Sequence, residues 1–383
     1  MPKPSVLHVI NNLNVSGATI LLLDVATRLR PEPGSLAICT LETENPMGDA
    51  LARTGARVLA PGSKLGLASG IRWVCRAIRQ TRPDIVHTHL LPATQVGLAA
   101  AKLMNKPVVT TVHFTFERLS ASGLLRRVNR TSFKFYRHIL AISEAVKKSI
   151  LDSCAVPPGR VMVLRSGVDF ARTSDPSLEL RRDIRRRFAI ADDELLIGSI
   201  GRLEEVKDYR LLIRATQRVR ANHSSVRLML AGDGSQRRSL EREVAETGLG
   251  DRVIFAGTQK EPAGFLAAFD IFALPSLHEG LGLSIIEAMG AGLPVIGSTA
   301  GGIPEVVSDA RSGLLFEAGN SAALADCLDR LIRSPELRRR LGEAGKAEVE
   351  QEFDIARYVE RLYEEYETML PAGEKAELAE TAT

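Results

Sequence analysis

The sequence predicts an α/β protein made of two doubly wound domains in tandem, each with a parallel sheet between layers of helices. Short apolar runs rich in Val and Ile alternate with amphipathic stretches, and the alternation starts again after residue 169. At 383 residues the chain also exceeds the roughly 250 to 300 residues at which a single core stops growing. Parallel strands need helical crossovers, and strands buried on both faces are apolar throughout, as these runs are.

In the first domain, residues 1–169, each strand is expected where an uninterrupted apolar run occurs, and each helix where apolar residues recur every three or four positions. The expected strands are Val6–Ile10, Leu36–Cys39, Val58–Leu59, Ile85–His87, Val108–Val112, Ile139–Ile142 and Val161–Leu164. The helices between them are expected at about Thr19–Leu29, Asp49–Thr54, Ser69–Gln80, Thr94–Met104, Leu124–Arg137 and Glu144–Leu151.

The second domain, residues 170–354, repeats this pattern after an Arg-rich helix at Leu180–Phe188. Its strands are expected at Leu195–Ile200, Arg227–Ala231, Val253–Ala256, Ile271–Leu274 and Pro294–Gly297. Its helices are expected at Arg210–Arg220, Gln236–Thr247, Ala263–Phe269 and Leu283–Met289, followed by helices that end near Glu350. Open sheets of this kind bind ligands beyond the carboxyl ends of their strands, so we expect the two domains to face a shared cleft. The Glu- and Ala-rich residues 370–383 are expected to form a flexible tail.

The composition is that of a soluble globular protein, with 45% hydrophobic and 25% charged residues. The amino terminus leads directly into an expected strand rather than a signal peptide, and no apolar window reaches the roughly 18 to 20 residues that cross a bilayer. We therefore expect a cytoplasmic protein with reduced, buried cysteines and no metal site. Residues 1–170 carry 22 Lys and Arg against 10 Asp and Glu, a basic half that favours anionic partners such as membranes.

The most informative motif lies between residues 275 and 289, where a loop links an expected strand to an expected helix. Gly280, Gly282 and Leu283 stand at the start of this helix, whose free backbone amides and dipole favour a diphosphate. Glu279 precedes the helix and Glu287 lies one turn inside it, where carboxylates can accept hydrogen bonds from sugar and ribose hydroxyls. The alternative is that Glu279 caps the helix and Glu287 is an ordinary surface residue.

A second motif follows the first strand of the second domain. Gly201 lets the backbone turn close to a ligand, and Arg202 and Lys207 place two cations beside it. A guanidinium offers phosphate a planar fork and an ammonium offers a mobile point charge. The alternative is that Arg202 and Lys207 are ordinary solvated surface residues.

Together the two motifs, Pro-Ser-x-x-Glu-Gly-x-Gly-x-x-x-x-Glu-Ala-Met and Gly-Arg-Leu-x-x-x-Lys, resemble the signatures of retaining glycosyltransferase family four. This family has the B fold of two Rossmann-like domains. The resemblance implies that Arg202 and Lys207 hold the donor diphosphate without a metal or other cofactor, and that the anomeric configuration is retained. It also implies that His113, after Val109-Thr110-Thr111-Val112, contacts the transferred sugar. It further implies a carboxyl-terminal helix, about 355–369, that packs back on the first domain.

The first loop departs from the family pattern. The family has Gly-Gly-Ala-Glu where this chain has Ser16-Gly17-Ala18-Thr19, so only Gly17 is kept to approach a phosphate. Ser166 stands where the family commonly has Asn. His87 and His89 end another strand, and we expect a structural pair rather than acceptor contacts.

The predicted function is transfer of a hexose-type sugar from a nucleoside-diphosphate sugar to a glycan, a lipid-linked acceptor or a small molecule, without nucleic acid. The alternatives are a nucleotide-sugar epimerase of the same fold and a catalytically impaired binding protein. A dehydrogenase is disfavoured because no Gly-x-Gly-x-x-Gly follows the first strand.

Two basic rows suggest peripheral contact with an anionic membrane, against the plainer reading of solvated helix faces. The first row combines Arg126, Arg130, Lys134 and Arg137 with the apolar Leu125, Val128, Phe133 and Tyr136. The second combines Arg72, Arg76, Arg79 and Arg82 with Trp73.

Overall fold

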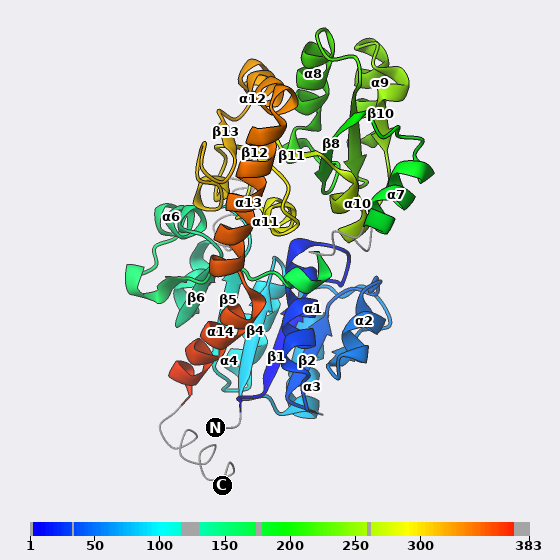
Figure 1. The fold of residues 1–383 in the computed structure, drawn as a ribbon. Helices are drawn as coiled ribbons and strands as arrows, with labels where there is room; N and C mark the ends of the chain where they lie inside the picture. Colours follow the sequence, from blue (N-terminus) through cyan, green and yellow to red (C-terminus); the bar gives the residue numbers. More distant parts are fainter. Residues whose placement is uncertain (1–2, 33, 116–129, 174–177, 259–261, 371–383) are drawn as a thin grey trace. The chain divides into compact units, whose positions relative to one another are not determined.

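The computed structural model describes residues 3–32, 34–115, 130–173, 178–258 and 262–370 (Figure 1). The chain divides into two compact units, Met1–Gly167 with Ile355–Thr383 and Val168–Asp354. The division falls close to residue 170, where the strand and helix alternation of the sequence begins again. Each predicted strand is present, with ends that shift by one or two residues. The expected tail lies almost wholly outside the described residues.

Unit 1 is a seven-stranded parallel sheet in the order β3-β2-β1-β4-β5-β6-β7. Its strands are β1 Val6–Ile10, β2 Leu36–Thr40, β3 Arg57–Leu59, β4 Ile85–His89, β5 Val108–Val112, β6 His138–Ala141 and β7 Val161–Val163. Its helices include α1 Gly17–Leu29, α2 Gly48–Arg53, α3 Leu67–Thr81, α4 Ala93–Leu103, α6 Glu144–Ser153 and α14 Ile355–Met369, with 3₁₀ turns η2 Phe133–Phe135 and η3 Pro158–Arg160. The strand order reverses between β1 and β4, the point at which such sheets leave room for a ligand.

The last helix, α14, belongs to the core of unit 1 although it comes from the far end of the chain. Its buried residues Tyr358, Leu362 and Tyr366 share one apolar cluster with Ile10 of β1 and Leu22 of α1. The helix contacts α1 directly. The carboxyl-terminal helix implied by the family resemblance is therefore part of the first domain's fold.

Unit 2 is a six-stranded parallel sheet in the order β10-β9-β8-β11-β12-β13. Its strands are β8 Leu195–Ile200, β9 Val226–Ala231, β10 Val253–Phe255, β11 Ile271–Leu274, β12 Val295–Ser298 and β13 Leu314–Phe316. Its helices include α7 Leu178–Arg187, α8 Tyr209–Arg220, α9 Arg237–Glu246, α10 Ala263–Ala268, α11 Leu283–Gly290, α12 Ser321–Arg333 and α13 Pro335–Glu352, with 3₁₀ turns η4 Phe170–Arg172, η5 Glu205–Lys207, η6 Gly250–Arg252 and η7 Ile303–Glu305. Strand β13 was not predicted, because its pairing with β12 defines it rather than a distinctive sequence pattern.

The predicted helix over residues 124–137 is wrong at its carboxyl end. Residues 124–129 lie outside the described part, and the 3₁₀ turn η2 gives way to extended backbone at Tyr136, with φ −80° and ψ 136°. The buried Tyr136 hydroxyl donates to the carbonyl of Thr94 at 2.6 Å and bonds the Thr88 hydroxyl at 2.8 Å. These bonds fix the tyrosine in the core as the chain enters β6. Arg130 and Arg137 therefore do not share one helix.

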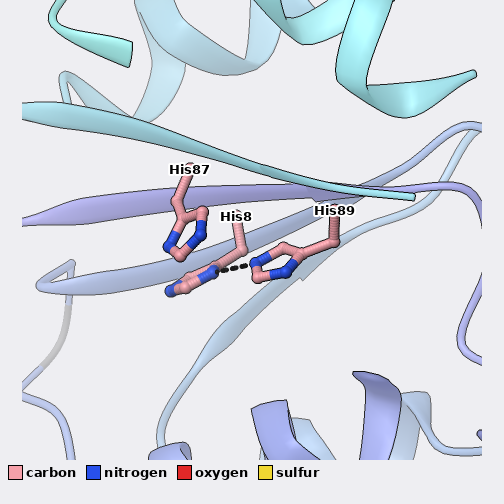
Figure 2. Close-up of side chains that lie close together, drawn as sticks. All are labelled: His8, His87 and His89. Atoms are coloured by element: carbon pink, nitrogen blue, oxygen red, sulfur yellow. Dashed lines mark hydrogen bonds between the residues drawn. The ribbon is translucent and has the colours of Figure 1, made fainter. Parts of the chain in front are cut away.

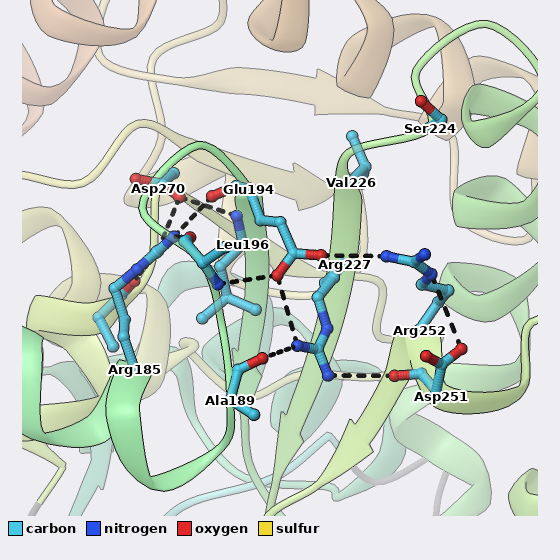
Figure 3. A network of polar contacts seen from close by, with 12 residues as sticks. Arg185, Ala189, Glu194, Leu196, Ser224, Val226, Arg227, Asp251, Arg252 and Asp270 are labelled. Carbon is cyan, nitrogen blue, oxygen red and sulfur yellow. Dashed lines mark hydrogen bonds and ion pairs between the residues drawn. The ribbon is translucent and has the colours of Figure 1, made fainter.

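A network of charged side chains fastens α7 and the start of β8 to the rest of unit 2 (Figure 3). Asp270 accepts hydrogen bonds from Arg181 at 2.7 Å, from Arg185 at 3.4 Å and from the backbone N–H of Leu196 at 2.8 Å. Arg185 is only 3% exposed. The carboxylate thus neutralises two arginines, one of them in the core.

We expect Asp270→Ala to destabilise the protein by about 3 to 5 kcal/mol, because it leaves the buried Arg185 guanidinium, which also bonds backbone carbonyls, without its neutralising carboxylate. Chemical denaturation measures this loss. The matched control is Asp152→Ala, whose partner Lys148 is exposed, and this variant should lose less than about 0.5 kcal/mol. Equal stability of the two variants would contradict a structural role for the network.

Candidate functional site

The residues predicted to hold a diphosphate gather at the point in unit 2 where the strand order reverses. Strands β8 and β11 are neighbours, although β9 and β10 lie between them in the sequence. The loop after β8 carries Gly201, Arg202 and Lys207, and the loop after β11 carries Glu279 and Gly280. The carboxyl ends of parallel strands share one edge, so both loops open on the position where open α/β sheets bind ligands.

An ion pair joins these two loops. Lys207 Nζ donates to Glu279 Oε2 at 2.5 Å, and the two side chains are 17% and 16% exposed. Ser276 Oγ donates to the same carboxylate oxygen at 3.1 Å, and the backbone N–H of Leu277 donates to the carbonyl of Val206 at 2.8 Å. The cation of the Gly-Arg-Leu-x-x-x-Lys motif and the carboxylate of the motif over residues 275–289 are therefore held in direct contact.

Arg202 is exposed, unlike Lys207. The turn that presents it has no room for a side chain at Gly201, because a Cβ there would lie 2.7 Å from the buried Tyr209 hydroxyl. Across the turn, a Cβ at Gly232 would lie 1.8 Å from the carbonyl oxygen of Gly201. Two glycines thus allow the close turn that directs a guanidinium to solvent.

Helix α11 begins at Leu283, directly after the two glycines of the motif over residues 275–289. Its cap, Gly282, has φ +95° and provides no side chain that accepts a hydrogen bond from the first turn. Gly301, with φ +53°, packs so close to Glu279 that a Cβ would lie 1.8 Å from its carbonyl oxygen. The first N–H groups of a helix have no partner within it, and the dipole adds partial positive charge, so this start is suited to an anion.

Glu287 is buried and paired with a cation that the sequence analysis missed. It is 7% exposed, and Arg172 donates to its Oε1 at 2.9 Å. Burial raises the pKa of the Glu287 carboxyl above its usual range, although Arg172 acts in the opposite direction. The ordinary surface reading of Glu287 is therefore excluded. Arg172 lies 115 residues away in η4, and no local pattern connects it to Glu287.

The altered loop of unit 1 begins helix α1. Ser16 is the N-cap, where its side chain accepts from the backbone N–H of Thr19 at 3.3 Å and bonds the Thr19 hydroxyl at 3.1 Å. Gly17 is the first helical residue and is exposed. The Ser and Thr that replace the family's Gly and Glu thus cap the helix, and Gly17 remains free to meet a ligand.

Three histidines, His8, His87 and His89, cluster on one face of the unit 1 sheet (Figure 2), and His113 is hydrogen-bonded to His89. His8 of β1 lies beside His87 of β4, and residues two apart in a strand share a face. His8 Nδ1 bonds His89 Nε2 at 2.9 Å, and His89 Nδ1 bonds His113 Nε2 at 3.1 Å. His87 bonds the Tyr366 hydroxyl at 2.6 Å and the Thr111 hydroxyl at 2.7 Å. The sequence analysis had paired His87 with His89 and had missed His8.

Burial keeps these imidazoles neutral. It lowers the pKa of His8 to about 3 and that of His113 to about 4. The pKa values of His87 and His89 also lie well below the usual range, by burial first and then by neighbouring histidines. One nitrogen from each of His8, His87 and His89 lies within 4.8 Å of the others, a spacing that makes them candidate metal ligands.

We expect acid to destabilise the protein from about pH 6.5 downward. In this range the histidines of the unfolded chain bind protons, whereas the same histidines stay neutral when they are buried in the folded protein. A histidine with a strongly lowered pKa contributes up to about 1.4 kcal/mol per pH unit in this window. Denaturant unfolding at pH 5 and pH 7 measures the slope. His8→Leu should flatten it, and an equal slope in both proteins would contradict neutral burial of His8.

Two family models match the chain. The model described as glycosyltransferase family 4 matches residues 15–172, and the model described as glycosyl transferases group 1 matches residues 181–348. The chain belongs to the family-four glycosyltransferases. It is 28% identical to a 2-deoxystreptamine glucosyltransferase from Streptomyces kanamyceticus over 77% of this chain and 80% of the relative. It is 27% identical to an N-acetyl-α-D-glucosaminyl L-malate synthase from Bacillus anthracis, over 81% and 79%.

The solved structures agree with this assignment at the level of the fold. The crystal structure of Anabaena HepE in complex with UDP-glucose matches with a TM-score of 0.87 and 22% identity, over 95% of this chain and 100% of HepE. The protein is thus a glycosyltransferase of the B fold, with two Rossmann-like sheets. In this enzyme, eight of the ten predicted site residues lie in unit 2, whereas Gly17 and His113 lie in unit 1. No described helix has the length and apolarity needed to span a membrane.

Proposed function

We propose that this enzyme transfers a hexose from a nucleoside-diphosphate sugar to a hydroxyl acceptor with retention of the anomeric configuration. The contact between Lys207 and Glu279 carries the proposal, because it puts a cation for the diphosphate beside a carboxylate for sugar hydroxyls. Arg202 and the start of α11 add positive charge at the same edge of the sheet. The complex of HepE with UDP-glucose supports a donor of this class.

The chemistry follows from where charge appears during the reaction. As the bond between the sugar and the diphosphate breaks, the leaving oxygen gains negative charge, and Arg202 and Lys207 stabilise it. Glu279 accepts a hydrogen bond from a sugar hydroxyl, and Glu287 binds the ribose diol. Because the two cations supply the charge that a metal supplies elsewhere, we propose that turnover needs no metal and persists in a chelator.

The test is a panel of UDP- and GDP-sugars with glycan, lipid-linked and small-molecule acceptors. Nucleoside diphosphate should be released only when donor and acceptor are both present, and NMR of the product should show the donor's anomeric configuration. An epimerase would convert the nucleotide sugar without an acceptor. An inverted product would contradict retention, and binding without turnover would favour an impaired transferase.

We also propose that the acceptor is met at an anionic membrane surface. On α3 the side chains of Arg72, Arg76 and Arg79 are exposed, and Phe135 is 60% exposed between Lys134 and Tyr136. Trp73 does not contribute as predicted, because its partly buried indole donates to the carbonyl of Thr40 at 3.0 Å. Arg126 lies outside the described residues. Phe133 and Tyr136 lie in the core rather than on a membrane-facing surface.

Vesicle sedimentation tests this surface. Binding should require anionic lipid and disappear in high salt, because each Lys or Arg near such a leaflet contributes about 1 kcal/mol that salt screens. Changing Arg72, Arg76 and Arg79 to Ser should weaken binding. The matched control changes exposed Arg238, Arg242 and Arg330 of unit 2 to Ser. Equal binding by both triple variants would contradict the proposed surface.

A further inference from the structure

The histidine cluster of unit 1 contains an unbranched chain of hydrogen bonds that ends at His113. In this chain His8 is bonded to His89, and His89 to His113, through both nitrogens of the middle ring. His8 and His89 are 2% exposed, whereas His113 is only partly buried. The chain therefore runs from the core to the one ring that the sequence places beyond a strand end.

The protons in such a chain are correlated. A neutral imidazole carries one N–H and one lone pair, so His89 can donate through only one nitrogen and must accept through the other. If His8 donates to His89, then His89 donates to His113, and the proton of His113 resides on Nδ1. If the direction reverses, Nδ1 of His113 becomes an acceptor. The middle ring thus sets whether Nδ1 of His113 donates or accepts.

The partner of His113 is the neutral imidazole of His89, which differs from the usual partners of such a histidine. A histidine of this kind is ordinarily oriented by a carboxylate or a backbone carbonyl, both of which only accept, so that its far nitrogen is left as an acceptor. A neutral imidazole can either donate or accept, and it adds no charge. His89 therefore orients His113 without favouring its imidazolium form, in keeping with the lowered pKa of about 4 at His113.

His87 supports the chain from the side and does not belong to it. Its two nitrogens are bonded to Tyr366 and Thr111, and its ring stacks on His89 with centroids 4.2 Å apart. The stacking limits rotation of the His89 ring. Because both nitrogens of His87 are engaged, a metal at His8, His87 and His89 would have to break existing hydrogen bonds. The observed contacts favour a hydrogen-bonded chain over a metal centre.

We propose that His89 is a positioning residue that fixes the ring of His113 and couples its tautomer to that of His8, so that its Nδ1 meets a hydroxyl of the sugar substrate. His8 completes the chain at its buried end. This inference rests on the proposed function, since it gives His113 a sugar hydroxyl as its partner.

The first measurement is long-range ¹⁵N NMR of the histidine rings at pH 7.5, which reports tautomers without any turnover. His8 and His113 should show the same ratio of neutral tautomers in the wild type and different ratios in His89→Leu. His89→Gln, whose amide can donate and accept, should restore the shared ratio in part. His138→Leu, outside the chain on β6, is the matched control. An unchanged His113 spectrum in folded His89→Leu would overturn the proposal even if the enzyme transfers no sugar.

The second measurement is a double-mutant cycle on transfer rate. Misplacing a contacting group by about 1 Å costs on the order of a hundredfold, so His89→Leu should lower kcat at least tenfold, with nucleoside diphosphate affinity unchanged. In a His113→Ala background, His89→Leu should lower kcat little further, because both substitutions disable the same pair of residues. Fully additive losses would show a merely structural role. Stoichiometric retention of Zn²⁺ by the wild type, lost in His8→Leu, would replace the chain with a metal site.

Discussion

Replacing Lys207 with Ala should lower kcat by about a hundredfold or more in a folded protein. A cation placed where charge develops stabilises the transition state more than the bound substrate, and loss of one such group commonly costs 10²-fold to 10³-fold. The structure adds a second reason. Without Lys207, the Glu279 carboxylate loses its ion-pair partner at 2.5 Å and gains freedom to leave the position in which it meets the sugar.

Steady-state rates of nucleoside diphosphate release measure the effect of Lys207→Ala. The matched control is Lys346→Ala, a lysine of the same unit in an exposed pair with Glu350, and this variant should keep the wild-type rate. Lys207→Arg separates charge from shape, because Arg keeps the charge but changes its reach. Wild-type turnover in folded Lys207→Ala would contradict both roles of the lysine, the stabilisation of the leaving group and the positioning of Glu279.

Replacing Glu287 with Gln should weaken the free nucleoside diphosphate and the intact donor alike, by about tenfold to a hundredfold. Hydrogen bonds to a charged group are worth about 1.5 to 3 kcal/mol, and Glu287 is proposed to accept from the ribose that both ligands contain. Glu279→Gln should instead weaken only the intact donor, because its proposed partner is the sugar. The two glutamates of one motif thus have separable roles.

Calorimetry with the donor and with its nucleoside diphosphate tests this division. Exposed Glu246→Gln on α9 is the control and should bind both ligands as the wild type does. Arg172→Ala provides a further comparison, because it leaves Glu287 in place but removes its partner at 2.9 Å. Equal losses for both ligands in both glutamate variants would reject the assignment of ribose to one and sugar to the other.

The strands and most helices could be predicted from the sequence because their signals are local. Short, mostly apolar runs identified β1, β5 and β8, and apolar spacing identified α1. The same local reasoning failed at Tyr136, where hydrogen bonds to Thr88 and Thr94 override the helical spacing. It also missed β13, which is defined by its pairing with β12.

The candidate site likewise contains residues that the sequence indicates and residues that only the structure identifies. Motif spacing identified Lys207 and Glu279 as candidates. Only the structure shows that they are in contact, because 72 residues separate them in the chain. Arg172 carried no signal, since its importance comes from burial beside Glu287. His8 looked like one residue of a buried strand. Only the register of β1 against β4 places it in a chain that reaches His113.

We propose above all that the turn after β8 and the start of α11 bind the diphosphate of a nucleotide sugar. Calorimetry with a nucleoside diphosphate and with its parent nucleoside, UDP beside uridine and GDP beside guanosine, tests this claim directly in wild type and Arg202→Ala. Arg202 is exposed, so its removal should disturb the fold little. We predict that diphosphate binding weakens at least tenfold whereas nucleoside binding is unchanged, because a charge-assisted hydrogen bond to phosphate is lost. Equal diphosphate affinity in wild type and variant would contradict the assignment.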